Sequence, residues 1–155
     1  MGHGFDAHRL VAGRPFILGG VTVEFPSGPF GHSDADVLVH AIADALLGAC
    51  ALGDLGAHFP DTDLQWAGAN SCTLLRASYD MVTKAGFHLV NIDATVVVQA
   101  PRLAPYLEAM RARLALTLDV DVSAISVKAK TSEGLGYTGD GTGISAYAVA
   151  MVSRP

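Results

Sequence analysis

The chain has 155 residues, which suits a single domain over residues 1–155 with a sizeable core. A net charge of −5 without any basic run argues against nucleic acid as a partner. No apolar run reaches membrane-spanning length without a charge or a histidine, and no leader is recognisable, so we expect a cytoplasmic protein that does not bind membranes. Charged residues make up only 16%, against roughly 25% in typical domains, which predicts surface buried in an oligomer.

The first half of the chain predicts short strands followed by a long helix. Residues 4–8 are expected to form an early strand, and residues 16–25 read as two short strands around a Gly-Gly turn. Ser33 is the expected helix N-cap, with Asp36 three residues later in the capping-box position. Residues 53–70 hold Gly, Pro, Asp and Asn without a sustained period, which predicts a long loop of the kind that often binds a ligand.

The second half of the chain predicts two further helices and three strands. Expected in chain order are a helix over 71–85, a strand over 91–99, a helix opened by Pro105, a strand over 125–130, a glycine-rich turn over 134–143 and a strand over 144–152. The last strand is apolar in both alternating registers, so both of its faces require cover. The order predicts an α+β fold in which helices are layered on a mixed four-stranded sheet, plus a small N-terminal hairpin.

Three ionisable residues lie along one side of the first expected helix. Asp36, His40 and Asp44 recur every fourth residue between apolar positions, and residues four apart share a helix face. An amphipathic surface helix is one interpretation, although so narrow a polar face weakens it. The other interpretation is that this face, Asp36 included, borders a metal site.

Asp6 and His8 supply a second polar group. Residues two apart in a strand project to the same side, so these two side chains are expected to lie together, although such a pair alone is a weak signal. With His40 they make two imidazoles and one carboxylate, a common ligand set for zinc that leaves a fourth position open. Asp44, one turn after His40, is expected to hold the second ring nitrogen of that histidine. The pattern therefore predicts a zinc site.

Short motifs spread along the chain carry a family resemblance. They lie at residues 2–8 (GHGFDAH), 31–36 (GHSDAD) with His40, 44–48, 53–56, 59–63, 99–101, 128–133 and 136–139. Together they resemble the 2-C-methyl-D-erythritol 2,4-cyclodiphosphate synthase family over essentially the whole chain. The resemblance implies a homotrimer with active sites at the subunit interfaces, which agrees with the low charge content.

The resemblance also implies a reaction. In that family, 4-diphosphocytidyl-2-C-methyl-D-erythritol 2-phosphate becomes the 2,4-cyclodiphosphate and CMP is released, within non-mevalonate isoprenoid biosynthesis. Such an enzyme is a phosphorus–oxygen lyase whose nucleophile is already an anionic phosphate oxygen. The step therefore needs positioning and charge stabilisation rather than an activated side chain. Consistently, the sequence contains no nucleophile elbow and no convincing catalytic triad.

Site residues follow from the same resemblance. Asp6, His8 and His40 would hold Zn²⁺, and Glu133 would bind Mg²⁺ or Mn²⁺ together with substrate phosphates. His32 and Thr131 would stabilise the transition state. The implied substrate-binding residues are Asp6, His8, His32, Ser33, Asp54, Leu55, Gly56, Phe59, Pro60, Asp61, Thr62, Asp63, Ala100, Pro101, Arg102, Leu103, Ala129, Lys130, Thr131, Ser132, Glu133 and Tyr137. Residues 100–103 and 129–131 would contact the cytidine end, and residues 54–63 the methylerythritol portion.

Two other functions stay open at this point. A metal-dependent phosphohydrolase would also use histidines and aspartates around a helix, but the sequence offers too few carboxylates at metal-ligand spacing for a second protein-held ion. A trimeric metal- or nucleotide-binding protein without turnover is the non-catalytic alternative.

Overall fold

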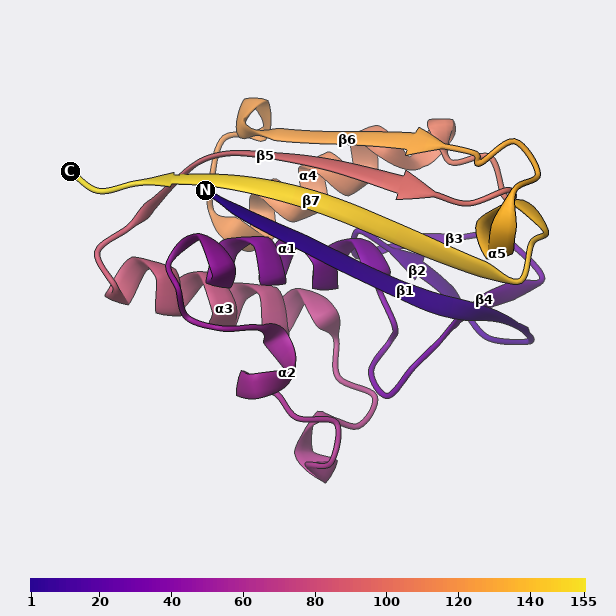
Figure 1. Ribbon diagram of the computed structural model, residues 1–155, viewed down its shortest axis with the longest axis horizontal. Helices are drawn as coiled ribbons and strands as arrows, with labels where there is room; N and C mark the ends of the chain where they lie inside the picture. The colour runs from indigo at the N-terminus through magenta and orange to yellow at the C-terminus, as the bar shows by residue number, and fades with distance from the viewer.

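One mixed five-stranded sheet forms the centre of the molecule (Figure 1). The computed structural model describes residues 1–155. The strands are β1 (Gly2–Ala12), β2 (Phe16–Leu18), β3 (Val21–Val23), β4 (Ser27–Phe30), β5 (His88–Val97), β6 (Ile125–Lys130) and β7 (Gly143–Ser153). The helices are α1 (Val37–Ala49), α2 (Leu55–His58), α3 (Ser71–Lys84), α4 (Leu107–Leu118) and α5 (Gly136–Gly139), with 3₁₀ turns at Leu64–Trp66, Ala104–Tyr106 and Val122–Ala124.

The sheet runs in the order β4-β1-β7-β5-β6. Only β5 and β6 are parallel, and the other neighbours are antiparallel. Helix α1 packs on β1, β7 and β5, helix α4 packs on β6, and α3 packs against both helices (Figure 1). The core lies between this helical layer and the inward-facing side chains of the sheet, where α1 alone contributes nine buried residues. The α+β class and the predicted hairpin, formed by β2 and β3, are confirmed.

The prediction of four strands is wrong, because β4 forms a fifth strand beside β1. Gly28 and Pro29 hide this strand in the sequence, since both residue types are depleted in strands. The strand lies at the edge of the sheet, where a residue without a backbone N–H is tolerated.

Helix starts also differ from the expectation. Helix α1 begins at Val37 with Asp36 as its N-cap, three residues later than a Ser33 cap would have it. The predicted loop over 53–70 contains α2 and the 3₁₀ turn at Leu64–Trp66. The glycine-rich turn over 134–143 contains α5, and α4 begins at Leu107 after its own 3₁₀ turn. Asp36, Asp54 and Asp63 cap α1, α2 and the turn at Leu64–Trp66 through their side chains, a local signal that hydrophobic periodicity does not detect.

Asp36 ties the hairpin to the first turn of α1. Its carboxylate accepts hydrogen bonds from the backbone N–H groups of Gly19 (2.9 Å), Gly20 (2.7 Å) and Val39 (3.1 Å). Gly19 and Gly20 both have positive φ, which glycine adopts without strain. The side chain of Asp36 is fully buried, and burial raises its pKa to about 6 despite the three donors. Asp36 therefore has a structural role, and the interpretation that it faces the metal site is wrong.

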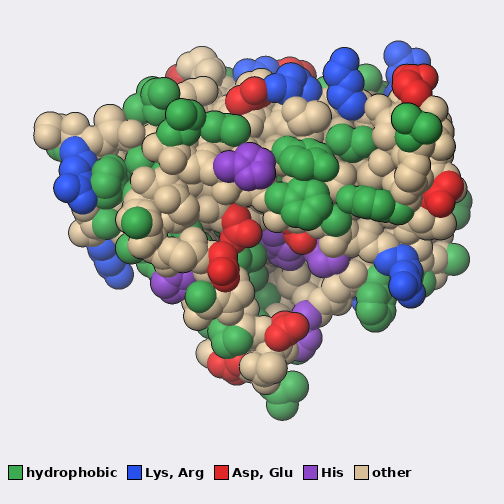
Figure 2. All heavy atoms as spheres, in the orientation of Figure 1, with side chains coloured by type: hydrophobic (Ala, Val, Ile, Leu, Met, Phe, Trp, Pro, Cys, Tyr) green, Lys and Arg blue, Asp and Glu red, His purple; other side chains and the backbone are tan.

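The opposite face of the sheet lacks a helical layer. Apolar side chains gather on it over β1 and β7, as the space-filling view shows (Figure 2). They include Phe5, Tyr147, Val149 and Met151, which are 39–46% exposed. The rings of Phe5 and Tyr147 contact each other with centroids 5.1 Å apart. None of the helices in the structure combines the length and apolar character that a membrane crossing needs.

Candidate functional site

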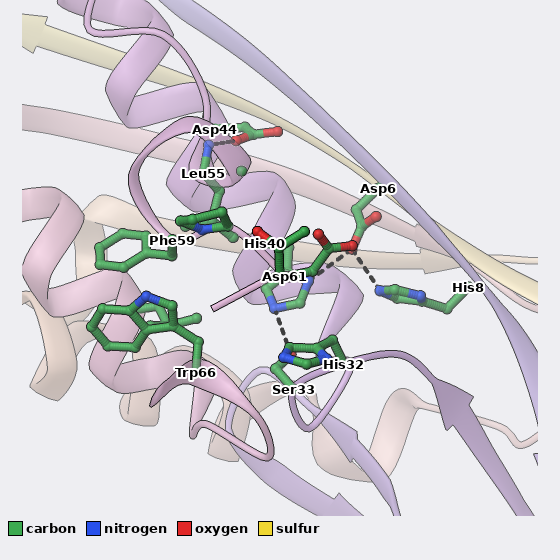
Figure 3. Close-up of a pocket in the computed structure, with 14 residues that line it drawn as sticks. Asp6, His8, His32, Ser33, His40, Asp44, Leu55, Phe59, Asp61 and Trp66 are labelled. Carbon is green, nitrogen blue, oxygen red and sulfur yellow. Dashed lines mark hydrogen bonds and ion pairs between the residues drawn. The ribbon is translucent and has the colours of Figure 1, made fainter. Parts of the chain in front are cut away.

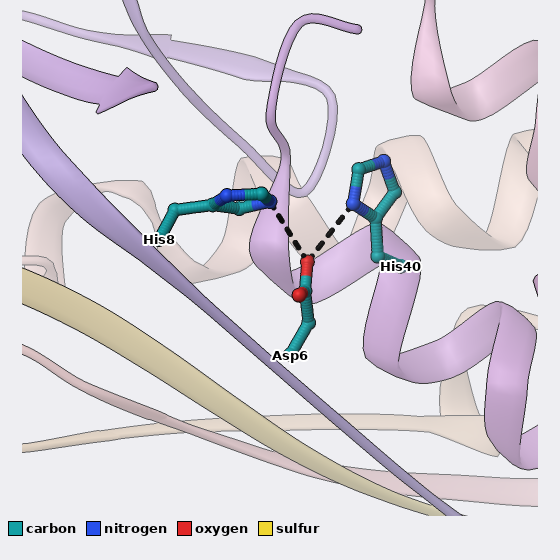
Figure 4. Close-up of side chains that lie close together, drawn as sticks. All are labelled: Asp6, His8 and His40. Carbon is teal, nitrogen blue, oxygen red and sulfur yellow. Dashed lines mark hydrogen bonds and ion pairs between the residues drawn. The ribbon is translucent and has the colours of Figure 1, made fainter. Parts of the chain in front are cut away.

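Asp6, His8 and His40 converge where β1 passes the N-terminal half of α1 (Figure 4). The Asp6 Oδ2 atom lies 3.0 Å from His8 Nε2 and 2.9 Å from His40 Nδ1. One ligand atom from each residue falls within 4.8 Å of the others, and all three side chains are partly buried. The strand alternation that pairs Asp6 with His8 is confirmed, and the helix brings His40 to the same point.

The donor set and its geometry fit a divalent metal ion. His8 Nε2 is buried and, although it lies near Asp6, it has no hydrogen-bond partner of acceptable geometry. A buried nitrogen left unpaired is unfavourable unless something else uses its lone pair. Two imidazole nitrogens and one carboxylate oxygen are a common three-ligand set for zinc. The three residues could therefore hold such an ion with one coordination position left open.

Mutual interactions shift the pKa values of two of these groups. Burial raises the pKa of Asp6, but the adjacent imidazole rings of His40 and His8 outweigh it and bring that pKa to about 2. Burial lowers the pKa of His40, but the hydrogen bond and charge of Asp6 reverse the effect and leave it raised. The Asp6 carboxylate is therefore ionised, as a metal ligand must be.

The second nitrogen of His40 contacts serines. Its Nε2 lies 2.8 Å from Ser71 Oγ and 3.3 Å from Ser33 Oγ. The expectation that Asp44 would hold this nitrogen is wrong, because Asp44 Oδ1 accepts the backbone N–H of Leu55 at 2.7 Å. Ser71 is the first residue of α3, far from His40 in the sequence, so periodicity along α1 could not identify it.

A pocket opens beside this cluster, between α1, β1 and the segment that includes α2 (Figure 3). Many predicted substrate-binding residues line it: Asp6, His8, His32, Ser33, Leu55, Gly56, Phe59, Pro60, Asp61 and Thr62. Asp54 and Asp63 do not line it, because they cap α2 and the following 3₁₀ turn. Lining residues missed from the sequence as substrate contacts are Asp44, Trp66 and Leu74.

A pair of aromatic side chains lines one side of the pocket. The rings of Phe59 and Trp66 meet edge-to-face with centroids 5.1 Å apart (Figure 3). Such pairs add stability beyond the area they bury. In the sequence, Phe59 and Trp66 bracket the short segment 60–65, and this pattern could have identified Trp66 as a pocket residue.

The remaining predicted substrate-binding residues lie outside this first pocket. Pro101, Arg102, Leu103, Ala129, Lys130 and Thr131 line a second hollow beside the ends of β5 and β6, whereas Ala100 does not line it. Tyr137 borders a third, smaller hollow that also contacts His8. Glu133 borders none of these hollows, and its carboxylate accepts a hydrogen bond of 3.0 Å from the Thr131 hydroxyl. Ser132 Oγ donates to the carbonyl of Leu135 at 2.7 Å.

The first pocket is short of positive charge for a phosphorylated ligand. Its acidic lining residues are Asp6, Asp44 and Asp61, and no lysine or arginine lines it. Arg102 and Lys130 line the second hollow instead. A polyanion in the first pocket would therefore need metal ions or cations from outside this chain.

Comparisons with known proteins agree along the chain. The chain is 59% identical over 152 residues to the 2-C-methyl-D-erythritol 2,4-cyclodiphosphate synthase of Laribacter hongkongensis (strain HLHK9), covering 98% of this chain and 94% of the relative. The structure of the bifunctional IspDF from Campylobacter jejuni matches 99% of this chain at 43% identity and a TM-score of 0.96, and this chain spans only 42% of that longer protein.

A third comparison concerns a ligand-bound structure. The CDP-bound form of a 2C-methyl-D-erythritol-2,4-cyclodiphosphate synthase matches 98% of this chain and 99% of its own length, at 37% identity and a TM-score of 0.90. The model of the YgbB family matches residues 1–153. Sequence, fold and site geometry thus lead to one conclusion: the chain belongs to the YgbB family, together with the 2-C-methyl-D-erythritol 2,4-cyclodiphosphate synthases.

Proposed function

We propose that this chain converts 4-diphosphocytidyl-2-C-methyl-D-erythritol 2-phosphate to 2-C-methyl-D-erythritol 2,4-cyclodiphosphate and CMP. The observation that carries the proposal is the Asp6–His8–His40 cluster at the pocket of a chain 59% identical to a synthase of that name. An oxygen of the 2-phosphate attacks the β-phosphorus, the bond to the bridging oxygen breaks, and CMP leaves with that bond's electrons. No side chain has to act as a nucleophile in this step.

Metal ligands are the first group of residues with proposed roles. Asp6, His8 and His40 would hold Zn²⁺, and Glu133, on its exposed turn, would bind Mg²⁺ or Mn²⁺ with the substrate phosphates. When bound, these ions would supply positive charge that brings phosphate oxygens together and offsets the charge developing during transfer. His32, which is exposed at the pocket beside Ser33, would donate a hydrogen bond to a phosphate oxygen.

The cytidine end of the substrate is assigned to the second hollow. Pro101 and Leu103 supply apolar surface there, and Arg102 and Lys130 supply the positive charge that the first pocket lacks. Thr131 lies at the rim of the same hollow and would stabilise the transferring phosphoryl group through its hydroxyl. The CDP-bound state of a relative at 37% identity supports a cytidine nucleotide as the ligand class.

A homotrimer would bring the two hollows together. Within one chain, the acidic first pocket and the basic second hollow share no lining residue. The apolar face over β1 and β7, with Phe5 and Tyr147 in contact on it, requires a covering partner (Figure 2). We propose that copies of this chain cover it, so that each active site combines the first pocket of one copy with the second hollow of its neighbour.

Phosphorus NMR can test the reaction directly. The protein is incubated with substrate, Zn²⁺ and Mg²⁺, and cyclic diphosphate with CMP is the expected product pair. Inorganic phosphate would instead indicate a phosphohydrolase, and unchanged substrate would indicate a binding protein without turnover. Either of these two results would overturn the proposal.

A further inference from the structure

Behind His40 lies a chain of hydrogen bonds that the proposed reaction does not itself require. Ser71 Oγ lies 2.8 Å from His40 Nε2 and donates its hydrogen to Asp34 Oδ1. Asp34 Oδ2 accepts the backbone N–H of Ser71 at 3.0 Å. The three residues come from the segment before α1, from α1 itself and from the start of α3. Ser71 is fully buried, so no water competes for its hydroxyl.

The donor and acceptor roles in this series of hydrogen bonds follow from counting hydrogens. A serine hydroxyl has one hydrogen, and an ionised carboxylate can only accept. Because the Ser71 hydroxyl gives its hydrogen to Asp34, its oxygen can only accept from His40. The Nε2 atom of His40 must therefore carry a hydrogen. In a neutral imidazole, this leaves Nδ1 without a hydrogen, and Nδ1 is the nitrogen that faces Asp6.

Ser33 is a weaker competitor for the same nitrogen. Its Oγ is 3.3 Å from His40 Nε2, against 2.8 Å for Ser71. Ser33 Oγ also accepts the backbone N–H of Ala35 at 3.1 Å, and no acidic group is hydrogen-bonded to its hydroxyl. Ser33 therefore does not impose a direction on the hydrogen bond to His40.

We propose that Ser71 and Asp34 are positioning residues that keep the hydrogen of His40 on Nε2 and so present a bare Nδ1 to the metal ion. The inference deepens the proposed function and rests on its metal site. Outer partners of this kind orient the ring, fix its tautomer and make the ligating nitrogen more basic. They act through His40 and touch neither the substrate nor the ion.

Zinc affinity of purified variants, measured by competition with a chromophoric chelator, tests the proposal without any assay of activity. Ser71→Ala should weaken zinc binding about 10- to 100-fold, the range for lost outer-shell partners of metal-binding histidines. Asp34→Asn should also weaken zinc binding, although it changes none of the proposed metal ligands. The Ser71 N–H, 3.0 Å from Asp34 Oδ2, would hold the amide oxygen of the asparagine in preference to the Asp36 N–H, which is 3.3 Å from Oδ1. The NH₂ group would then face Ser71 Oγ and turn the hydroxyl hydrogen toward His40 Nε2.

A double variant tests whether Asp34 acts through Ser71. In Ser71→Ala/Asp34→Asn, the fold-loss of zinc affinity should be well below the product of the two single fold-losses, because both changes break the same series of hydrogen bonds. Ser71→Thr keeps the hydroxyl and should restore most of the affinity. In the zinc-loaded wild-type protein, the Nε2–H of His40 should give a slowly exchanging signal in nitrogen-resolved NMR, and Ser71→Ala should abolish its protection.

Ser78→Ala is the matched control. Ser78 is a fully buried serine on the same helix, and its hydroxyl donates to the Leu74 carbonyl at 2.9 Å. The control should lose stability like Ser71→Ala but keep wild-type zinc affinity. Unchanged affinity in both Ser71→Ala and Asp34→Asn, or a loss in Ser33→Ala in their place, would overturn the inference. A wild-type protein that binds no zinc would instead refute the metal site itself.

Discussion

Gly4 of β1 lies so close to Ala41 of α1 that a β-carbon on the glycine would stand 1.9 Å from the Ala41 carbonyl oxygen. Gly2 meets Ala45 in the same way, at 2.1 Å. Only glycine can occupy these positions, because any side chain would push the strand away from the helix. This close approach places Asp6, two residues along β1, within reach of His40, the neighbour of Ala41. The candidate metal site therefore depends on a close backbone contact between β1 and α1.

Gly4→Ala should damage both stability and zinc binding. Overpacking a close contact destabilises by about 1–3 kcal/mol, and separating β1 from α1 moves Asp6 away from His40. Urea unfolding and chelator competition measure the two effects. Gly48→Ala is the control, because its added methyl would meet only the His3 carbonyl at 3.9 Å. A Gly4→Ala protein with wild-type zinc affinity would contradict the argument.

Asp36 should make the protein less stable as pH rises. Its folded pKa, about 6, lies above the ordinary value of 3.8. The stabilisation that Asp36 contributes is therefore fully present below its pKa in the unfolded state. It is lost as the pH rises through its pKa in the folded state. Asp36→Asn does not titrate. Between about pH 4 and pH 7, the free energy of unfolding of the wild type should fall relative to that of the variant by up to about 3 kcal/mol.

Urea titrations of both proteins in a chelating buffer measure this difference, since groups common to both cancel. The chelator keeps metal ions from altering the pKa of Asp36. The prediction fails if the wild type keeps or gains stability relative to Asp36→Asn as pH rises. Such a result would show that the three N–H donors to this carboxylate outweigh its burial.

His40→Ala should abolish stoichiometric zinc binding while the chain stays folded. The variant removes one of three ligands, and two remaining ligands on one strand hold zinc far more weakly. Metal analysis after dialysis and circular dichroism provide the measurements. His88→Ala, at an exposed position at the start of β5, is the control and should retain its zinc. Zinc retained in His40→Ala would refute the ligand assignment.

Glu133→Gln should change the magnesium requirement far more than the zinc content. Glutamine keeps the size of the side chain but removes the charge that a hard cation prefers. The Mg²⁺ concentration for half-maximal activity should rise by about tenfold, as the loss of one charged interaction predicts. Glu24→Gln, which changes an exposed glutamate on another segment, should match the wild type. Coinciding magnesium titrations for Glu133→Gln and the wild type would count against the role.

Tyr147→Lys should disrupt the proposed trimer. The substitution buries a charge without a partner in the apolar face over β1 and β7 if copies of the chain meet there. Analytical ultracentrifugation should show a shift from trimer toward monomer. Leu116→Lys changes a more exposed apolar residue, 74% accessible on α4, and should leave the assembly intact. Equal sedimentation of Tyr147→Lys and wild type as trimers would exclude this face from the interface.

The sequence by itself identified the three candidate metal ligands. Alternation in β1 pairs Asp6 with His8, and the helical period placed His40 on the polar side of α1. These are local regularities of strand and helix geometry, so they survive whatever the rest of the chain does. The strand and helix classes over most of the chain were predictable for the same reason.

The tertiary structure decided which polar residues meet those ligands. Asp36 and Asp44 share the helical period of His40, yet one binds the Gly19–Gly20 turn and the other the start of α2. Ser71, which contacts His40, is 31 residues away along the chain. No sequence period links residues so far apart, because their contact depends on how α3 packs against α1. Hydrogen-bond partners between elements are set by that packing, whereas a residue's face on its own helix is set by local geometry.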